Sequence, residues 1–359
     1  MLQRIKRFLN EEMPSYFRAK DKKPYFQQYK EMSALWSYYR YLPYHYIKDS
    51  IYLKSFDGDV LDYLPPKWVE RYQMHINPAN SRANADDKII FNELMIAAGI
   101  PIIPIYFVID RHSGILHLDS NTTTQFDRFV NELSHCKSKH FFVKPYNALC
   151  GEGIFRFELQ DGKLLIENKV YDKAAFFNTL FSKHFKKFIV QPAVEQHQVL
   201  HKLCPSSINT VRIHTFALNN EIIINSALLR MGNGTSYVDN ATKGGFFAKI
   251  DIDTGQLAST ATNKTKYGGI VTDCHPATRV KFEGITIPYW SEVLQTIKVG
   301  VEQLKPLKWL GWDVVIGIDG PIILETNQNF GVFLCQYGAN GLRKTALGKE
   351  IITKFLPSK

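Results

Sequence analysis

The sequence has no long apolar run and only five cysteines among 359 residues. None of its apolar stretches reaches the roughly 18 residues that a helix needs to cross a bilayer. The N-terminus is positively charged, but no apolar segment follows it, so no secretory signal is predicted. The cysteines are scattered, odd in number and without a Cys-x-x-Cys pair. This usage argues against a disulfide framework and a zinc site, and it predicts reduced thiols in a cytoplasmic protein.

Familiar phosphate-binding signatures are missing as well. Gly151 and Gly153 have the Gly-x-Gly spacing, and glycines let backbone N–H groups approach a phosphate closely. No Gly-Lys-Ser/Thr follows, which excludes a Walker loop, and no x-x-Gly completes a dinucleotide fingerprint. There is also no low-complexity tract and no long block of one charge. The glycine loop by itself is therefore only a weak signal.

The composition that is present is globular, with a basic excess. Hydrophobic residues make up 45% and charged residues 22% of the chain, which is typical of a globular protein and, at this length, of two or three domains. The formal net charge is +10, and residues 1–48 carry ten Lys or Arg against four Asp or Glu. Such an excess favours acidic partners: nucleotides, nucleic acid, an anionic membrane or an acidic saccharide. The charge alone does not choose among them.

The first 75 residues are both basic and aromatic. Ten aromatic residues stand from Tyr25 to Tyr52, counting both. They suit a platform for a sugar, a base or a membrane interface, or else a layer that packs on the main body of the protein. Pro65-Pro66 and Asn77-Pro78 then mark a boundary near residue 76.

A β-hairpin is predicted near the C-terminus. Asp319-Gly320 separates two apolar runs, Val314–Ile318 and Ile322–Leu324. An Asp-Gly pair between hydrophobic strands is a strong hairpin signal. We therefore expect the two runs to pair as neighbouring strands.

Polar side chains stand at the ends that this hairpin brings together. Asp313 is expected at the start of the first strand, whereas Glu325 and Asn327 end the second and share one of its faces. Two carboxylates and an amide oxygen suit Mg²⁺, which binds hard oxygen ligands together with substrate phosphates. Polar strand ends that only face water are the alternative.

Periodicity predicts the other elements of the chain. A helix is expected from Asp86 or Asp87, either of which can cap it, to Gly99. Further helices are predicted over 122–133, 174–184, 290–304 and 342–355. Strands are predicted over 101–108, 141–145, 155–159, 188–191, 211–218, 222–230 and 246–252, followed by an irregular stretch to about residue 287.

Cationic residues follow a definite order along the chain. Lys88 opens a helix, and Lys144 ends a strand directly before the glycine loop. Arg212 and His214 share one face of a later strand, and Arg230 ends the return strand. Lysines, glycine N–H groups, arginines and Mg²⁺ ligands together are what binding a triphosphate requires. Protein kinases place the glycine loop before the lysine, so this order disfavours them.

This order resembles the ATP-grasp superfamily of carboxylate–amine ligases and, more closely, the sugar-transfer-associated ATP-grasp family found with bacterial surface-polysaccharide genes. The resemblance extends over about residues 30–340. The motifs that carry it are Asp87-Lys88, Ser207-Ile208-Asn209-Thr210-Val211-Arg212, Gly244-Gly245, His275-Pro276, Ile287-Pro288-Tyr289-Trp290, Gly311-Trp312-Asp313 and Glu325-Thr326-Asn327.

The resemblance implies an α+β fold, the ATP-grasp fold, in which two α+β subdomains clasp ATP between them. A basic aromatic N-terminal extension is expected to precede them over 1–75. An N-terminal ATP-grasp subdomain is expected over 76–118 and a central lid subdomain with the glycine loop over 119–190. A C-terminal ATP-grasp subdomain with the metal site is expected over 191–359.

The resemblance also implies roles in nucleotide binding. Lys88 and Lys144 correspond to the paired lysines that hold the α- and β-phosphates, with Lys144 also near adenine. The glycine loop corresponds to the mobile flap over the phosphates. The adenine edge and the ribose correspond to Gln191, Ala193, Val194 and Glu195. At the first of these positions the better-known ligases commonly have a glutamate.

The remaining implied roles concern the metal and the chemistry. The Mg²⁺ ligands correspond to Asp313, Glu325 and Asn327. The clamps for the γ-phosphate or the acyl phosphate correspond to Arg212, Arg230 and Asn240. His214 is a candidate base by position, with a hydrogen-bonded strand histidine as the alternative.

The implied function is an ATP- and Mg²⁺-dependent ligase that forms an acyl phosphate and then an amide bond. The expected substrates are an amine, such as an amino acid, and a carboxylate, such as a uronic acid, within a sugar nucleotide or a surface glycan of capsule or lipopolysaccharide. A peripheral membrane contact through the basic N-terminus is also expected. A catalytically inactive ATP sensor and a single-stranded nucleic-acid-binding protein are the alternatives. No RNA-binding signature is present, and no specific nucleic-acid partner is expected.

Overall fold

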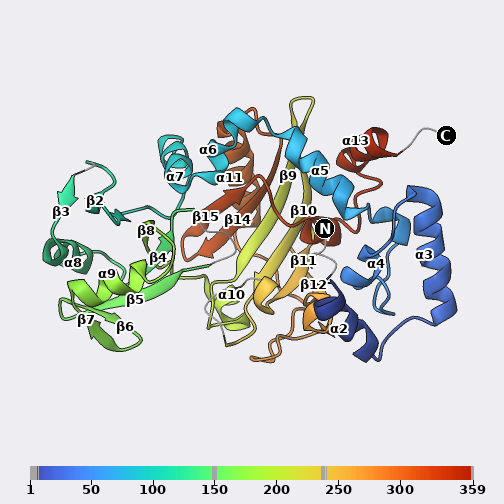
Figure 1. The fold of residues 1–359 in the computed structure, drawn as a ribbon, viewed down its shortest axis with the longest axis horizontal. Coiled ribbons are helices and arrows are strands. Elements are labelled where there is room, and N and C mark those ends of the chain that lie inside the picture. The colour runs from blue at the N-terminus through green and yellow to red at the C-terminus, as the bar shows by residue number, and fades with distance from the viewer. Residues whose placement is uncertain are drawn as a thin grey trace. The chain divides into compact units, whose positions relative to one another are not determined.

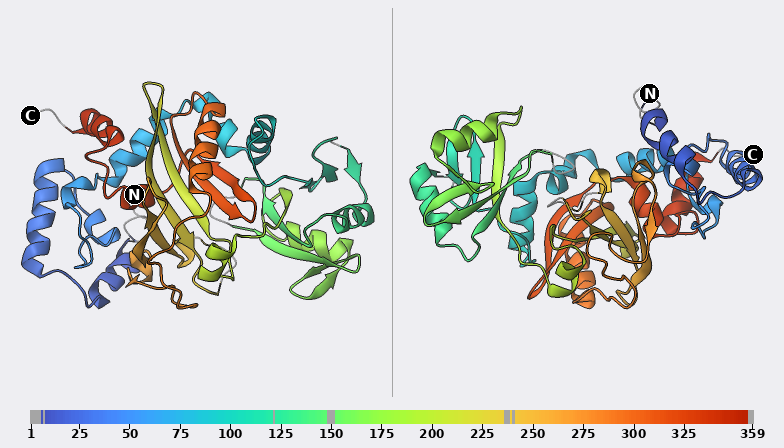
Figure 2. Two further views of the ribbon diagram at one scale, coloured as in Figure 1. Left: turned by 180° about the vertical axis from the view of Figure 1, so that it is seen from behind. Right: turned by 90° about the horizontal axis from the view of Figure 1, so that it is seen from below.

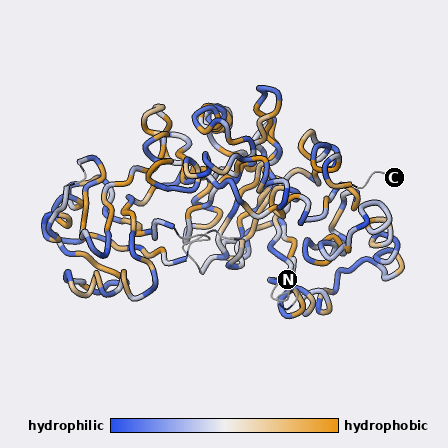
Figure 3. The backbone as a smooth tube through the Cα atoms, turned by 45° about the horizontal axis from the view of Figure 1, so that its top comes forward, coloured by the Kyte–Doolittle hydropathy of each residue, from blue (hydrophilic) through white to orange (hydrophobic). Residues whose placement is uncertain are grey.

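The computed structural model describes residues 6, 8–120, 122–147, 152–235, 239 and 241–356, so Gly151 and Asn240 lie outside the described residues. The chain forms two compact units (Figure 1). The first consists of Met1–Arg82, Gln196–Pro321 and Thr326–Lys359, and the second of Ala83–Glu195 and Ile322–Glu325. Within the described ranges no helix is long and apolar enough to cross a membrane, and Figure 3 shows hydrophobic stretches that are short and interrupted.

A seven-stranded sheet forms the centre of the first unit. Its order is β13-β12-β11-β10-β9-β14-β15. The strands are β9 (Thr210–Leu218), β10 (Glu221–Met231), β11 (Phe246–Ile250), β12 (Leu257–Thr262), β13 (Val271–Thr272), β14 (Trp309–Gly317) and β15 (Gly320–Asn327). Strand β9 pairs antiparallel with β10 on one side and with β14 on the other, and this register sets Asp313 opposite Arg212. The sheet thus places polar residues on neighbouring central strands.

One hydrophobic core of the first unit contains residues from both the N-terminal and the C-terminal parts of the chain. Tyr39, Tyr46 and Tyr52 are fully buried in it, together with Trp309 and Leu347. The α-helices of this unit are α2 (Met13–Arg18), α3 (Tyr25–Tyr39), α4 (His45–Lys48), α5 (Pro66–Ile76), α10 (Gln198–Leu203), α11 (Trp290–Gln303), α12 (Val332–Gly338) and α13 (Ala346–Phe355). Shorter turns are η1 (Phe8–Glu12), η2 (Val60–Asp62), η3 (Ala79–Ser81), η4 (Ala241–Lys243) and η5 (Thr265–Tyr267). Part of the aromatic extension therefore packs on the main body.

An eight-stranded sheet carries the second unit, which Figure 2 shows from two further sides. Its order is β3-β2-β1-β8-β4-β5-β6-β7. The strands are β1 (Phe107–Asp110), β2 (Gly114–His117), β3 (Thr123–Thr124), β4 (His140–Pro145), β5 (Phe155–Gln160), β6 (Lys163–Ile166), β7 (Lys169–Tyr171) and β8 (Lys187–Pro192). The helices are α6 (Ala83–Asp86), α7 (Lys88–Ala97), α8 (Phe126–Ser134) and α9 (Lys173–Phe181). Buried phenylalanines, among them Phe129, Phe141, Phe157 and Phe176, pack between the helices and the sheet.

The structure confirms the elements with the strongest sequence signals. Strands β14 and β15 are neighbours in the sheet, as the Asp-Gly signal predicted. Strands β9 and β10 cover the predicted ranges within a residue or two. Helix α7 begins where expected, because the Asp87 side chain accepts hydrogen bonds from the N–H groups of Ile89 and Ile90. Positive φ at Gly99 follows its end.

Other elements differ from the prediction. The strand predicted over 101–108 is reduced to β1, because Pro101 and Pro104 have no N–H to donate to a ladder. Asp313 lies in the middle of β14 and not at its start, since the strand continues back to Trp309. The helix predicted over 122–133 begins only at Phe126.

Two further regions were also predicted wrongly. The stretch expected to be irregular up to residue 287 contains β12 and β13. The single C-terminal helix predicted over 342–355 is the shorter α13, whose N-cap Thr345 accepts from the Gly348 N–H, and α12 precedes it. Short, half-polar segments such as these carry too little periodicity to separate a helix or strand from a loop.

Candidate functional site

A pair of lysines marks one end of the second unit's sheet. Lys144 lies on β4, and its Nζ donates to Oε1 of Gln191 on the neighbouring β8 at 2.9 Å. The Gln191 amide in turn donates from Nε2 to the Ile103 carbonyl at 2.9 Å, so it is fixed in orientation. Lys88, the first residue of α7, donates from Nζ to the Tyr146 carbonyl at 3.2 Å. Both predicted lysines therefore lie in the second unit and bond to neutral oxygens.

Burial lowers the pKa of Lys144 to about 8. The largest cause is desolvation, which disfavours the charged amine. Glu325 opposes the shift and Lys88 adds to it. A lysine with a lowered pKa would be stabilised in its charged form by a further negative charge nearby. This property suits a binding site for an anion such as a phosphate.

The residues predicted at the adenine edge follow the same strand. Gln191 is buried and bonded as described, and Ala193 donates its N–H to the His140 carbonyl at 2.8 Å. Val194 is half-buried and Glu195 is exposed, both just after the end of β8. The structure thus brings Lys144 and Gln191 into contact. Ala193, Val194 and Glu195 come directly after β8, which carries Gln191.

Gly153 is the described part of the predicted flap. Its φ is +68°, and a Cβ at this position would come within 2.7 Å of both Phe185 and Pro145. A larger residue would be strained there in conformation and in space. The need for glycine at this position is explained by packing within the second unit.

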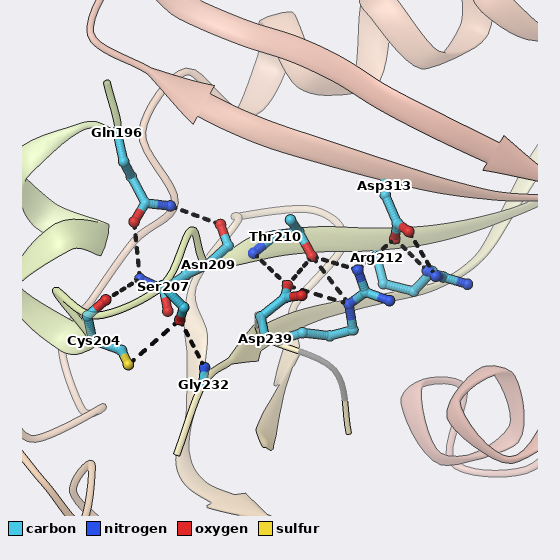
Figure 4. Close-up of polar contacts among 10 residues, drawn as sticks. Gln196, Cys204, Ser207, Asn209, Thr210, Arg212, Gly232, Asp239 and Asp313 are labelled. Atoms are coloured by element: carbon cyan, nitrogen blue, oxygen red, sulfur yellow. Dashed lines mark hydrogen bonds and ion pairs between the residues drawn. The ribbon is translucent and has the colours of Figure 1, made fainter. Parts of the chain in front are cut away.

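A buried network of arginines and aspartates lies in the first unit (Figure 4). Arg212 of β9 donates from Nε to Oδ1 of Asp313 at 2.6 Å and from Nη2 to Oδ2 at 2.8 Å. Arg230 of β10 contacts the same carboxylate, with Nη2 3.1 Å from Oδ1. Asp313 is only 1% exposed. Two of the three predicted clamps, Arg212 and Arg230, are therefore connected to one predicted metal ligand, Asp313.

The network continues from Arg230 to a residue that the sequence did not indicate. Its guanidinium donates from Nε and Nη2 to Oγ1 of Thr210 at 3.0 and 2.7 Å. Asp239 accepts from the N–H and hydroxyl of Thr210, and its Oδ2 lies 3.5 Å from Arg230 Nε. Burial raises the pKa of this carboxyl, although Arg230 opposes the rise. Asp239 stands beside the predicted Asn240 in a polar loop, and no spacing pattern distinguishes the two.

A second polar cluster fixes the segment that leads into β9 (Figure 4). The Asn209 Nδ2 group donates to Gln196 Oε1 at 2.9 Å, and Gln196 Nε2 donates to the Asn209 carbonyl at 2.8 Å. Ser207 accepts from the Gly232 N–H at 3.2 Å and donates to the Cys204 thiol. These bonds explain the polar residues of the Ser-Ile-Asn-Thr-Val-Arg motif, because they hold the start of the strand that carries Arg212.

His214 is completely buried on β9. Its Nδ1 lies 2.7 Å from the Ser226 hydroxyl, and its ring packs on Phe330. Burial, and then the charge of Arg212, lower its pKa well below the usual value, so the ring is neutral. These are the properties of a hydrogen-bonded strand histidine, and we assign it no proton-transfer role.

The model of the sugar-transfer-associated ATP-grasp proteins matches residues 68–349. The chain belongs to this ATP-grasp family. The match covers most of the chain and both sheets, and it confirms the family resemblance and the α+β ATP-grasp fold that the sequence motifs predicted. No curated protein matches the chain.

Solved structures that resemble this ATP-grasp chain are distant. VanG D-Ala:D-Ser ligase from Enterococcus faecalis matches at 14% identity and a TM-score of 0.43, covering 78% of this chain and 63% of that one. D-alanyl-alanine synthetase A from Vibrio cholerae O1 matches at 14% identity and a TM-score of 0.47, with 78% and 68% covered. L-amino acid ligase from Bacillus licheniformis matches at 9% identity and a TM-score of 0.40, with 72% and 44% covered. The chain thus spans less than two thirds of the length of the first and third of these.

Membership in the ATP-grasp family implies Mg²⁺, and the predicted ligands are of the right chemical kind. Asp313 lies on β14, and Glu325 and Asn327 lie on the neighbouring β15, half-buried. Asp313 already accepts from two guanidinium groups, so a metal ion there would share or replace these contacts. Among the described residues no three His, Cys, Asp or Glu side chains are grouped to hold a metal. A metal would therefore depend on the Asn327 amide and on substrate phosphates as well.

Proposed function

We propose that this protein is an ATP- and Mg²⁺-dependent ligase that joins an amine to a carboxylate through an acyl phosphate. The observation that carries the proposal is Lys144, a half-buried cation that bonds to a neutral amide and has a lowered pKa. Burying a lysine without a carboxylate at hydrogen-bonding distance costs stability, and an anionic ligand would recover it. Membership in an ATP-grasp family supports ATP as that ligand.

In this proposal the second unit binds the nucleotide. Lys88 and Lys144 hold the α- and β-phosphates, with Gly153 in the flap that covers them. Gln191 presents Lys144 in a fixed position. Ala193 and Val194 meet the adenine edge and Glu195 the ribose, since they follow Gln191 directly on the chain.

Arginines of the first unit take part in the reaction. Arg212 and Arg230 stabilise negative charge on the γ-phosphate and the acyl phosphate, and Asn240 assists them. The carboxylate substrate attacks the γ-phosphate, ADP leaves, and the amine then attacks the acyl carbon and releases phosphate. Mg²⁺ bound to Asp313, Glu325 and Asn327 would neutralise phosphate charge. Thr210 and Asp239 keep the Arg230 guanidinium in place.

We further propose an amino acid and a uronic acid as the substrate classes, with the product entering a capsule or lipopolysaccharide. The description of the family as associated with sugar transfer supports a saccharide substrate, free, nucleotide-linked or within a glycan. The described cysteines Cys136, Cys204, Cys274 and Cys335 are free thiols, which supports a cytoplasmic location.

The test is a phosphate-release screen of the purified protein with ATP, Mg²⁺, uronic acids and the common amino acids. Release that requires both an acid and an amine is the expected result. Glu325→Gln should abolish this turnover while the circular dichroism spectrum stays unchanged, whereas the exposed Glu221→Gln should be as active as the native protein. If no pair stimulates release, the ligase proposal is wrong.

A catalytically inactive ATP sensor is the second candidate. The observation in its favour is that both oxygens of Asp313 are engaged by arginines. A sensor would bind ATP without amine-dependent release of ADP, and equilibrium binding measured beside the release assay separates the two.

A further inference from the structure

The aromatic residues of the N-terminal extension divide into a buried and an exposed set. Tyr39 at the end of α3 is 1% exposed and belongs to the core of the first unit. On the same helix Tyr25 is 71%, Phe26 80%, Tyr29 72% and Trp36 51% exposed. Four large aromatic side chains in one short segment are far more than the scattered apolar residues of an ordinary surface. They require an explanation beyond packing.

The exposed aromatic side chains form one surface. At about 100° per residue, Tyr25, Phe26, Tyr29 and Trp36 fall within roughly one third of the circumference of α3. This arc lies next to the side of the helix that buries Gln28, Leu35 and Tyr39. Phe17, 66% exposed, is the last residue but one of the preceding α2. We call these five side chains, Phe17, Tyr25, Phe26, Tyr29 and Trp36, the aromatic face.

Lys22 ties the two helices of the aromatic face together. Its Nζ donates to the carbonyls of Tyr16 and Phe17 at 3.1 and 3.2 Å. The same ammonium group lies 4.9 Å from the ring centre of Tyr16 and 6.0 Å from that of Tyr25. The end of α2 and the start of α3 are thus held side by side, and Phe17 and Tyr25 belong to one surface.

Positive charge surrounds the aromatic face. Arg18, Lys20, Lys30 and Arg40 are exposed along the same helices. The nearby acidic groups are already matched. Glu31 bonds to Lys23 and to the Tyr46 hydroxyl, and Asp21 lies 4.0 Å from Lys54. The excess charge that remains exposed is therefore positive.

A hollow adjoins the same surface. It has a volume of about 380 Å³ and is lined by Ser15, Arg18, Ala19, Lys266, Tyr267 and Gly268. Two of these residues are cations: Arg18 directly follows Phe17 of the aromatic face, and Lys266 lies 3.7 Å from Glu11. A concave surface that contains an exposed arginine suits the phosphate of a lipid headgroup.

We propose that the aromatic face is a docking surface for an anionic lipid bilayer. Tyrosine and tryptophan are the side chains that prefer the headgroup region, and phenylalanine reaches the acyl boundary below it. Exposed lysines and arginines around them are attracted by anionic lipids. A second copy of the chain fits less well, because pairing two such faces would set like charges against each other. The inference does not depend on the proposed ligase activity.

The direct test is sedimentation of the full chain with vesicles of phosphatidylcholine, with and without one quarter phosphatidylglycerol. We expect binding only to the anionic vesicles and at least a tenfold loss of binding in 0.5 M salt. Emission from Trp36 should shift to shorter wavelength on binding, because the other four tryptophans are buried. Trp36→Phe should keep the binding and lose the shift.

Matched variants distinguish binding through the aromatic face from non-specific hydrophobic adsorption. Phe26→Ser with Tyr29→Ser, and separately Lys20→Gln with Lys30→Gln, should each weaken vesicle binding at least tenfold without lowering the melting temperature. Ile96→Ser with Val170→Ser, which changes two exposed apolar residues elsewhere, should bind as the native protein does. The proposal would be overturned by equal binding to neutral and anionic vesicles or by no binding to either. It would also be overturned if the native protein were a dimer and the Phe26 and Tyr29 substitutions made it a monomer. Soluble phosphate release should be the same in all variants.

Discussion

The two units compensate their buried cations in opposite ways. In the first unit Arg212 meets a carboxylate at 2.6 and 2.8 Å, and Arg230 lies between two aspartates. In the second unit, among the described residues, the hydrogen-bond partner of Lys144 is the neutral Gln191 amide. A matched pair is nearly neutral and holds the fold together, whereas an under-compensated lysine draws in an anion. The comparison predicts which residues matter for stability and which for ligand binding.

Removing the guanidinium of Arg212 should have the largest effect on folding. Arg212→Met takes two hydrogen bonds from a buried carboxylate that keeps its contact with Arg230, and unfolding in urea should show a loss of roughly 3 kcal/mol. The double variant with Asp313→Asn should recover most of this loss. Arg128→Met removes an exposed ion pair with Glu132 and should cost less than about 1 kcal/mol. If Arg212→Met and Arg128→Met are equally stable, the stability of the first unit does not depend on its matched buried charges.

Lys144→Met should act on binding and not on stability. The loss of one charge-assisted hydrogen bond to phosphate, about 1.5–3 kcal/mol, predicts ATP affinity at least tenfold weaker by calorimetry. The melting temperature should stay the same or rise, because a half-buried amine that is costly to desolvate has been removed. The exposed Lys163→Met is the control for a general effect of charge. A variant that loses stability but binds ATP normally would contradict the comparison.

Asp49 provides a third type of buried carboxyl, because no cation among the described residues forms an ion pair with it. Burial raises the pKa of this carboxyl to about 6, with Lys48 and Lys264 opposing and Glu12 adding. The folded protein therefore holds this proton more tightly than the unfolded chain, so stability is lost as the pH rises through 6. Asp49→Asn should gain about 1–2 kcal/mol at pH 7.5 and almost nothing at pH 4. A gain that is equal at both pH values would exclude a charge effect.

The smallest expected effect is that Lys144 takes up a fraction of a proton when ATP binds. The pKa of Lys144 is about 8 without ligand, and bound phosphates should raise it. At pH 8 ATP binding should then take up about half a proton, measured as a difference in heat between buffers of unlike ionisation enthalpy. Affinity should fall as the pH rises from 7 to 9. Both effects should be missing in Lys144→Met.

Local signals in the sequence predicted the parts of the fold that depend on neighbouring residues. Asp87 predicted the start of a helix, and Asp-Gly predicted a turn between two strands. Each of these structures depends on only a few neighbouring residues. The lysines, arginines and carboxylates were proposed as site residues because their order along the chain resembles a family.

Contacts between distant residues could not be predicted in this way. No local pattern shows that Asp313 faces Arg212, because that pairing is set by the register of two strands a hundred residues apart. Asp239 was missed for the same reason. The division of the N-terminal aromatic residues into buried and exposed sets depends equally on which face of α3 the core covers.

The interrupted course of the first unit has a consequence during synthesis. Asn77 donates to the carbonyl of Trp309, a residue 232 positions later, and nearly all of the second unit is encoded between them. At typical rates of translation the N-terminal helices would wait on the order of 10–50 s for their partners to leave the ribosome. The second unit, apart from Ile322–Glu325, emerges whole in that interval. We expect a holding chaperone to bind the nascent N-terminal segment, whose buried tyrosines are exposed until the last strands arrive.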